Sequence, residues 1–226
     1  MVFNNPSLDW SSPSDHVELF RRGMSITKGE WQEQRDAVPM DLRYSSDHDI
    51  LSNQGFLNMV YQILNLRPGS GHFTAPVCST WVFLRLCWKL RKLNAPRSRG
   101  STGRSESSPL GWDYDSVLLL AQRKKIWWIL EQPINSLMER HPLFVALMRL
   151  MPIRRMPTAM SWFGGATRKP TWLYSSHAEI DRVNDYADRT LQGDNTTREM
   201  VVPYQDRRGR RRIKGGRDLK NSQAYP

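Results

Sequence analysis

Residues 68–81 (PGSGHFTAPVCSTW) bring together the residue types best suited to chemistry in this chain. The glycines indicate a turn, and residues 72–75 are short and extended enough for a buried strand. Pro76 stops regular strand pairing because its ring fixes φ and removes the N–H donor. Cys78 follows in a loop, and loops after strands build the ligand crevice of an open α/β sheet. As a thiolate, Cys78 would be a nucleophile, but a free cysteine is more often a small buried hydrophobic residue.

Short strands and helices alternate along the chain on either side of this loop. Apolar runs predict strands at residues 16–20, 37–42, 72–75 and 125–131. Helices are predicted at residues 25–34, 53–66, 116–122, 136–151 and 178–191, and strands at 160–163 and 171–175 form a late hairpin. This alternation predicts an α/β fold with a mainly parallel sheet covered by helices.

The charge balance of the chain is strongly basic. Its 226 residues include 33 Lys and Arg against 22 Asp and Glu, which gives a formal net charge of +11. This length fits one domain with tails, and a hydrophobic fraction of 39% suggests that part of the chain is not packed. Because a basic surface attracts polyanions, nucleic acid is the expected partner.

Cysteine and histidine usage argues against a metal partner. Cys78 and Cys87 are the only cysteines, and their spacing fits neither a disulfide framework nor a metal site. The N-terminus lacks the basic start and apolar core of a signal peptide, and no apolar run is long enough to span a membrane. The expectation is a soluble intracellular protein without a membrane or metal partner.

Composition divides the chain into three parts. Residues 1–15 form a loose polar lead-in, residues 16–193 hold the α/β domain, and residues 194–226 form a basic tail. Residues 206–220 (DRRGRRRIKGGRDLK) are too polar to bury a core, so the tail is predicted to be disordered. The charge of the tail also allows a nuclear location.

Taken in order, the motifs resemble those of the cytosine-5 DNA methyltransferases, and more closely a divergent, shortened branch that lacks a target-recognition domain. The resemblance covers roughly residues 17–176. The matching stretches are Val17-Glu18-Leu19-Phe20, Asp41, Asp49-Ile50, Pro76-Val77-Cys78, Glu131-Gln132-Pro133 and Lys169-Pro170-Thr171. The resemblance implies a Rossmann-like S-adenosylmethionine-dependent methyltransferase fold, with a mainly parallel sheet and a late antiparallel hairpin.

The resemblance also implies roles for single residues. Cys78 matches the nucleophile that attacks C6 of a cytosine flipped from the duplex, and Glu131 matches the carboxylate that holds the cytosine edge. Lys169 matches a basic residue that supports the catalytic loop. The implied cofactor is S-adenosylmethionine, and the positions that match its pocket are Glu18, Phe20, Gly23, Asp41, Asp49, Ile50 and Pro76. In this match Asp41 accepts hydrogen bonds from the ribose hydroxyls.

Basic and aromatic residues are the candidates for nucleic-acid contacts. Arg99 and Arg104 lie in a Ser-, Gly- and Arg-rich run that suits phosphate contacts, although a plain basic loop explains it equally well. Trp81 is a candidate for base stacking beside the crevice. The tail adds Arg207, Arg208, Arg210, Arg211 and Arg212. DNA is favoured over RNA, and neither a target sequence nor an oligomeric state is indicated.

One departure from the family separates two functional hypotheses. Where the family has a Ser-Gly-x-Gly turn, this chain reads Arg21-Arg22-Gly23-Met24, and only Gly23 remains to let a ligand approach the backbone closely. The first hypothesis is a nucleic-acid cytosine methyltransferase, and the second is an inactive methyltransferase fold that binds nucleic acid. A third is a product of altered splicing or gene decay that does not fold stably.

Overall fold

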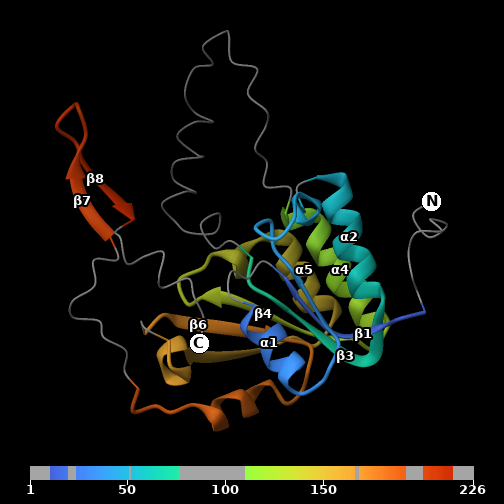
Figure 1. The fold of residues 1–226 in the computed structure, drawn as a ribbon. Helices are drawn as coiled ribbons and strands as arrows, with labels where there is room; N and C mark the ends of the chain where they lie inside the picture. The colour runs from blue at the N-terminus through green and yellow to red at the C-terminus, as the bar shows by residue number, and fades with distance from the viewer. Residues whose placement is uncertain are drawn as a thin grey trace.

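The protein is described by a computed structural model over residues 11–19, 24–50, 52–76, 110–165, 168–191 and 201–215 (Figure 1). The large sheet contains β1 (Ser14–Leu19), β2 (Ala37–Met40), β3 (Leu66–Thr74), β4 (Trp127–Pro133), β5 (Arg154–Ala159) and β6 (Pro170–Ser175). Two further strands, β7 (Val201–Gln205) and β8 (Arg211–Gly215), form a small antiparallel sheet. The predicted α/β class is confirmed.

The large sheet is mostly parallel. Its strand order is β2-β1-β3-β4-β6-β5. β1 pairs in parallel with β2 and β3, and β3 pairs in parallel with β4. β6 is antiparallel to both of its neighbours, β4 and β5, so it runs against the other five strands. The predicted mainly parallel sheet with a late antiparallel pair is therefore present.

The helices cover both faces of this sheet. α2 (Asn53–Leu64), α4 (Leu110–Arg123) and α5 (Pro142–Leu150) gather on one face, and α1 (Ser25–Gln32) lies on the other (Figure 1). From β1 to β2 the chain moves toward one edge of the sheet, and from β2 to β3 it moves back toward the other edge. Because such crossovers are right-handed, α1, which connects β1 to β2, and α2, which connects β2 to β3, lie on opposite faces. α2 begins where the Ser52 hydroxyl accepts a hydrogen bond from the Gly55 N–H, and α5 begins at Pro142.

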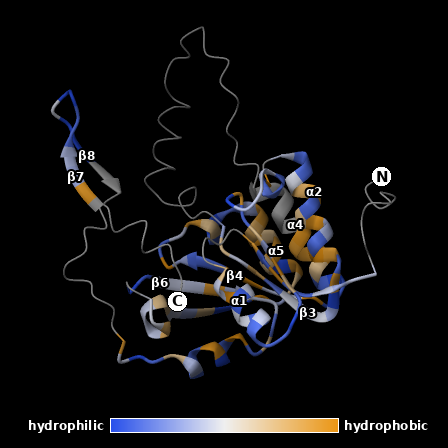
Figure 2. Cartoon of the chain, viewed as in Figure 1, coloured by the Kyte–Doolittle hydropathy of each residue, from blue (hydrophilic) through white to orange (hydrophobic). Residues whose placement is uncertain are grey.

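The main hydrophobic core lies between the sheet and α2, α4 and α5 (Figure 2). Its fully buried members include Val17, Leu19, Ile63, Leu118 and Trp128. A smaller cluster of Met156, Leu173 and Ile180 packs on the opposite face, because Leu173 alternates with the core residue Tyr174 along β6. His72 is also buried, and burial lowers its pKa to about 3, so the ring is neutral at physiological pH.

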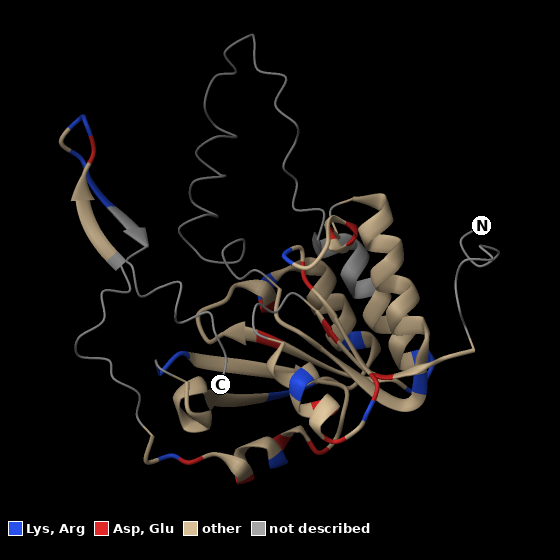
Figure 3. Ribbon diagram, viewed as in Figure 1, with Lys and Arg blue, Asp and Glu red and all other residues tan. Residues whose placement is uncertain are grey.

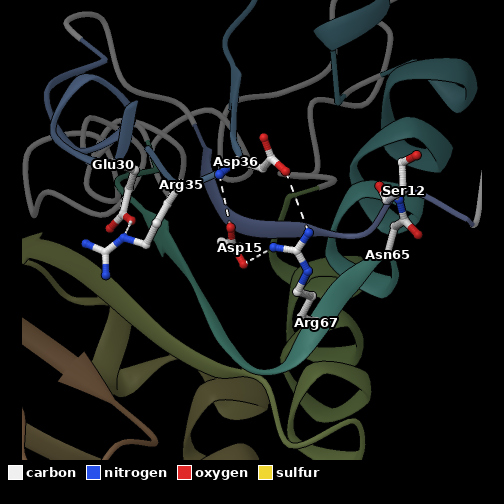
Figure 4. A network of polar contacts seen from close by, with 7 residues as sticks. All are labelled: Ser12, Asp15, Glu30, Arg35, Asp36, Asn65 and Arg67. Carbon is white, nitrogen blue, oxygen red and sulfur yellow. Dashed lines mark hydrogen bonds and ion pairs between the residues drawn. The ribbon is translucent and has the colours of Figure 1, made fainter. Parts of the chain in front are cut away.

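Ion pairs close the amino end of the central strands (Figure 4). Arg67 at the start of β3 pairs with Asp15 of β1 and, at 3.6 Å, with Asp36 just before β2. The Asp36 N–H donates to Asp15 Oδ2 at 3.0 Å, and the Asn65 side chain donates to the Ser12 carbonyl at 3.2 Å. Arg67, Asp15 and Asp36 are therefore paired with one another at the amino end of the strands. The candidate functional residues lie at the carboxyl end.

The late hairpin differs in position from the prediction. Residues 160–163, predicted as a strand, form a 3₁₀ helix (Met160–Phe163), and the partner of β6 is β5, Arg154–Ala159. The β5 sequence RRMPTA contains two arginines and a proline, so it lacks the apolar pattern that predicts a strand. β5 is an edge strand, where charged residues and proline are tolerated since one side makes no ladder hydrogen bonds.

Two other segments also differ from their predictions. The helix predicted at residues 178–191 is a 3₁₀ helix over Ile180–Tyr186, in which Ile180 and Val183 both pack on the smaller cluster. A 3₁₀ helix repeats every three residues, so these two side chains share one face. Part of the tail predicted as disordered forms the β7–β8 hairpin. None of the helices in the described ranges is both long and apolar enough to cross a membrane.

We predict that Gly71→Ala destabilises the protein, because the β3 backbone touches the indole of Trp127. A Cβ at Gly71 would lie 2.3 Å from Trp127 ring atoms, and the ring is held by a 3.0 Å hydrogen bond from its Nε1 to the Gly69 carbonyl. Overpacking of this kind costs about 1–3 kcal/mol, measurable by urea unfolding. Gly29→Ala in α1 is the matched control. A Cβ at Gly29 would have no neighbouring atom within 4 Å among the residues that the structure describes, so this change should be neutral or stabilising. Equal stability of the two variants would contradict the packing described.

Candidate functional site

The carboxyl ends of the parallel strands form the candidate site. The strand order reverses direction between β1 and β3, because β2 lies on one side of β1 while β3 and β4 continue on the other. In open α/β sheets, ligands bind in the crevice outside such a switch point. The residues at this edge include Glu18 of β1, Asp41 after β2, Pro76 after β3 and Glu131 of β4.

Glu18 is buried near the end of β1 and supports the start of α1. Its Oε2 accepts hydrogen bonds from the Thr27 N–H at 2.8 Å and the Thr27 hydroxyl at 2.7 Å. Thr27 is in the first turn of α1, whose N-cap residue, Met24, provides no side-chain cap. A carboxylate at a helix N-terminus satisfies backbone N–H groups and meets the positive end of the helix dipole. Glu18 therefore fixes α1 against the sheet.

Asp41 immediately follows β2 and is partly exposed. Its Oδ1 accepts the Arg43 N–H at 2.9 Å, and its carbonyl accepts the Tyr44 N–H at 2.9 Å, so it anchors a tight turn. Burial raises the pKa of Tyr44, and the carboxylates of Asp41 and Glu18 raise it further. Asp41 and Glu18 lie at the carboxyl ends of adjacent strands.

The predicted pair Asp49-Ile50 lies just before α2. The Ser52 hydroxyl donates to the Asp49 carbonyl at 2.7 Å, and the backbone at Gly55 approaches so closely that a Cβ there would lie 2.1 Å from the Asp49 oxygen. Ile50 packs against the main core. This segment is thus held by the first turn of α2, and part of the Ile50 side chain serves the core.

Glu131 and Lys169 form an ion pair at the carboxyl end of β4. The Lys169 Nζ lies 3.4 Å from Glu131 Oε1, and their side chains are 20% and 4% exposed. Lys169 precedes β6, the antiparallel neighbour of β4, so the pairing of these two strands brings the residues together. Lys169 has φ of 33°, a strained conformation for a residue other than glycine, and its carbonyl accepts from the Thr171 hydroxyl at 2.9 Å.

Gln132 connects the ends of β3 and β4. Its Nε2 donates to the Pro76 carbonyl at 3.2 Å, and its Oε1 accepts the Ser136 hydroxyl at 2.9 Å. The side chain is fully buried, so both hydrogen bonds are shielded from water. In the sequence Gln132 is part of the Glu131-Gln132-Pro133 motif, and no local pattern predicts its contact with Pro76. It holds the chain two residues before Cys78.

Glu18 and Glu131 lie on the same face of the sheet. Strand register places Glu18, Phe73 and Ile129 side by side across β1, β3 and β4. Glu131 follows Ile129 by two residues, and side chains in a strand alternate between faces, so its side chain points to the face of Glu18. Two buried carboxylates therefore stand on either side of β3 on the α1 face of the sheet.

The remaining predicted residues fall into two groups. Phe20, Gly23, Cys78, Trp81, Arg99 and Arg104 lie outside the described residues. The predicted arginines of the tail, Arg207, Arg208, Arg210, Arg211 and Arg212, lie in the β7–β8 hairpin and its loop. Within the described ranges, no group of three or more His, Cys, Asp or Glu side chains could hold a metal ion.

Comparisons of the chain with protein-family models, with curated proteins and with solved structures found no match.

We predict that Glu131 and Lys169 are energetically coupled. Lys169→Met should destabilise the protein by about 1–3 kcal/mol, because it removes a cation that lies 3.4 Å from a buried carboxylate, and should cost less in a Glu131→Gln background. A double-mutant cycle by urea unfolding measures the coupling. The control is Arg154 with Asp181, which are also 3.4 Å apart but 56% and 65% exposed. That pair should couple by less than about 0.5 kcal/mol, and equal coupling in the two cycles would contradict the buried-pair assignment.

Proposed function

We propose that this chain is an S-adenosylmethionine-dependent cytosine-5 methyltransferase-like protein that acts on nucleic acid. The observation that carries the proposal is the placement of Glu18, Asp41, Pro76 and Glu131 together at the carboxyl edge of a mostly parallel sheet. These residues come from four of the matching motifs. The sequence motifs alone did not require that they share one edge.

The switch point between β1 and β3 suits a nucleotide-like cofactor. Asp41 stands at the end of β2, where a partly exposed carboxylate can accept hydrogen bonds from ribose hydroxyls. The neighbouring Tyr44 is part of the same turn and is also partly exposed, which offers an aromatic surface beside that carboxylate. S-adenosylmethionine, when bound, supplies the methyl group for transfer to C5 of cytosine.

The edge at β4 suits the base. Glu131 offers a buried carboxylate that can accept a hydrogen bond from the amino group of a flipped cytosine, and Lys169 holds that carboxylate in place. Gln132 fixes the Pro76 carbonyl, so the chain enters the Cys78 loop beside Glu131. In the mechanism implied by the resemblance, the Cys78 thiolate would add to C6 and make C5 nucleophilic toward the methyl group. Loss of the C5 proton to a base would then break the C6–S bond, restore the C5–C6 double bond and release the thiolate.

A second function is an inactive methyltransferase fold that binds nucleic acid. The sequence Arg21-Arg22-Gly23-Met24 favours it, since two arginines replace the small residues that let a backbone approach a cofactor. The two functions differ first in cofactor binding and then in methyl transfer.

Cofactor binding is the decisive measurement. Isothermal titration calorimetry of the full chain with S-adenosylmethionine and with S-adenosylhomocysteine should give binding heats for both. Asp41→Ala should weaken binding by about tenfold or more, because a hydrogen bond to a charged group is lost. Asp47→Ala, an exposed acid in the following turn, is the control and should bind normally. An absence of heat with the unaltered chain would support the inactive fold.

Methyl transfer tests the nucleophile. Labelled methyl groups should be transferred to cytosine-containing DNA by the unaltered chain and by Cys87→Ser, which changes the only other cysteine. Cys78→Ser should abolish transfer but keep the cofactor heat, because a serine hydroxyl is not ionised at neutral pH. Transfer by Cys78→Ser at the unaltered rate would rule out Cys78 as the nucleophile.

A further inference from the structure

Asp206 organises the loop of the β7–β8 hairpin. Its carboxylate accepts hydrogen bonds from the backbone N–H groups of Arg208 at 2.9 Å and Arg210 at 3.1 Å. It also accepts from the side-chain Nε of Arg210 at 3.0 Å and of Arg212 at 3.2 Å. Gly209 has φ of 71° and donates its N–H to the Asp206 carbonyl at 2.9 Å. One acid thus closes the loop and holds two arginines in fixed positions.

The hairpin carries a high density of positive charge (Figure 3). Residues 201–215 contain five arginines and one lysine against one aspartate, a formal charge of +5. Arg210 and Arg212 pair with Asp206. Arg207, Arg208 and Arg211 are exposed, and none of them forms an ion pair with another residue that the structure describes. These three guanidinium groups are available to a polyanionic partner.

The charges are distributed over both faces of the hairpin and its tip. Register pairs Gln205 with Arg211 and Tyr204 with Arg212, and neighbouring residues of a strand point to opposite faces. Arg211 therefore lies on one face and Arg212, which is paired with Asp206, lies on the other. Arg207 and Arg208 lie in the loop between the strands. A flat anionic surface would contact one face of the ribbon, whereas the walls of a groove contact both.

We infer that the β7–β8 hairpin binds in the major groove of B-form duplex DNA and contacts phosphates on both strands. That groove is about 12 Å wide and admits a two-stranded β-ribbon. The deep, narrow major groove of A-form RNA excludes one. In the described part of the chain, β7 and β8 form a sheet of their own, so neither strand is committed to the large sheet. The inference rests on the nucleic-acid partner of the proposed function and names its form.

Binding is measured on the full chain without cofactor, so its failure is distinguishable from a failure of methyl transfer. Fluorescence anisotropy with short DNA and RNA duplexes of the same sequence should show DNA binding at least about tenfold tighter. The triple variant Arg207→Gln/Arg208→Gln/Arg211→Gln should weaken DNA binding. It should also reduce the log–log salt slope by about 0.9 for each phosphate that the variant no longer neutralises.

The matched control removes the same charge from the α/β body. Arg123→Gln/Arg140→Gln/Arg149→Gln changes three exposed arginines and should leave most of the DNA affinity and the salt slope unchanged. Equal reductions of affinity in the two triple variants would show general charge attraction and overturn the inference. Equal affinity for DNA and RNA duplexes would overturn it as well.

Asp206→Ala separates shape from charge. The variant gains one positive charge, so simple attraction to a polyanion predicts tighter DNA binding. The groove assignment predicts weaker binding by several-fold, because the loop that positions Arg208, Arg210 and Arg212 loses its common acceptor. Thermal unfolding of the α/β body should not change. Tighter binding would overturn the inference, as would displacement of DNA by phosphatidylcholine vesicles containing phosphatidylserine.

Discussion

The parallel pairing of β1 with both β2 and β3 is the constraint on which the rest of this structure depends. β1 contributes Val17 and Leu19, both fully buried, to the core between the sheet and α2, α4 and α5. The chain passes from β1 to β2 on one side and then returns to β3 on the other side of β1. Right-handed crossovers therefore place α1 and α2 on opposite faces of the sheet. The candidate site lies at the carboxyl ends of β1, β2, β3 and β4.

The same constraint explains how two buried carboxylates are tolerated. Removing a carboxylate from water is costly unless hydrogen bonds or a cation compensate for it. Glu18 accepts two hydrogen bonds from Thr27 of α1, and Glu131 forms an ion pair with Lys169, which immediately precedes the neighbouring strand β6. An apolar residue would fill either position without this need. The proposed function gives a reason for acids at both places, since each lies near the carboxyl end of a parallel strand, where open α/β sheets bind ligands.

The basic charge of the chain is organised differently in its two sheets. In the α/β body several arginines are paired, such as Arg67 with Asp15, Arg155 with Glu139 and Arg182 with Glu179. In the hairpin Asp206 pairs with two arginines, Arg210 and Arg212. The other three arginines, Arg207, Arg208 and Arg211, are exposed. Net charge alone predicted a polyanionic partner, but the hairpin shows where on the chain that excess is presented and in what geometry.

The sequence by itself determined the alternation of strands and helices, and through it the α/β class, because apolar periodicity is a local property. It also placed Asp41 near the end of the second strand and Glu131 in the fourth. Tertiary structure decided that RRMPTA is a strand, since only an edge position tolerates its arginines and proline. It also decided which residues meet: Lys169 reaches Glu131 through strand pairing, and Gln132 reaches Pro76 across parallel strands. Contacts between residues distant in sequence depend on register and packing, which no local pattern specifies.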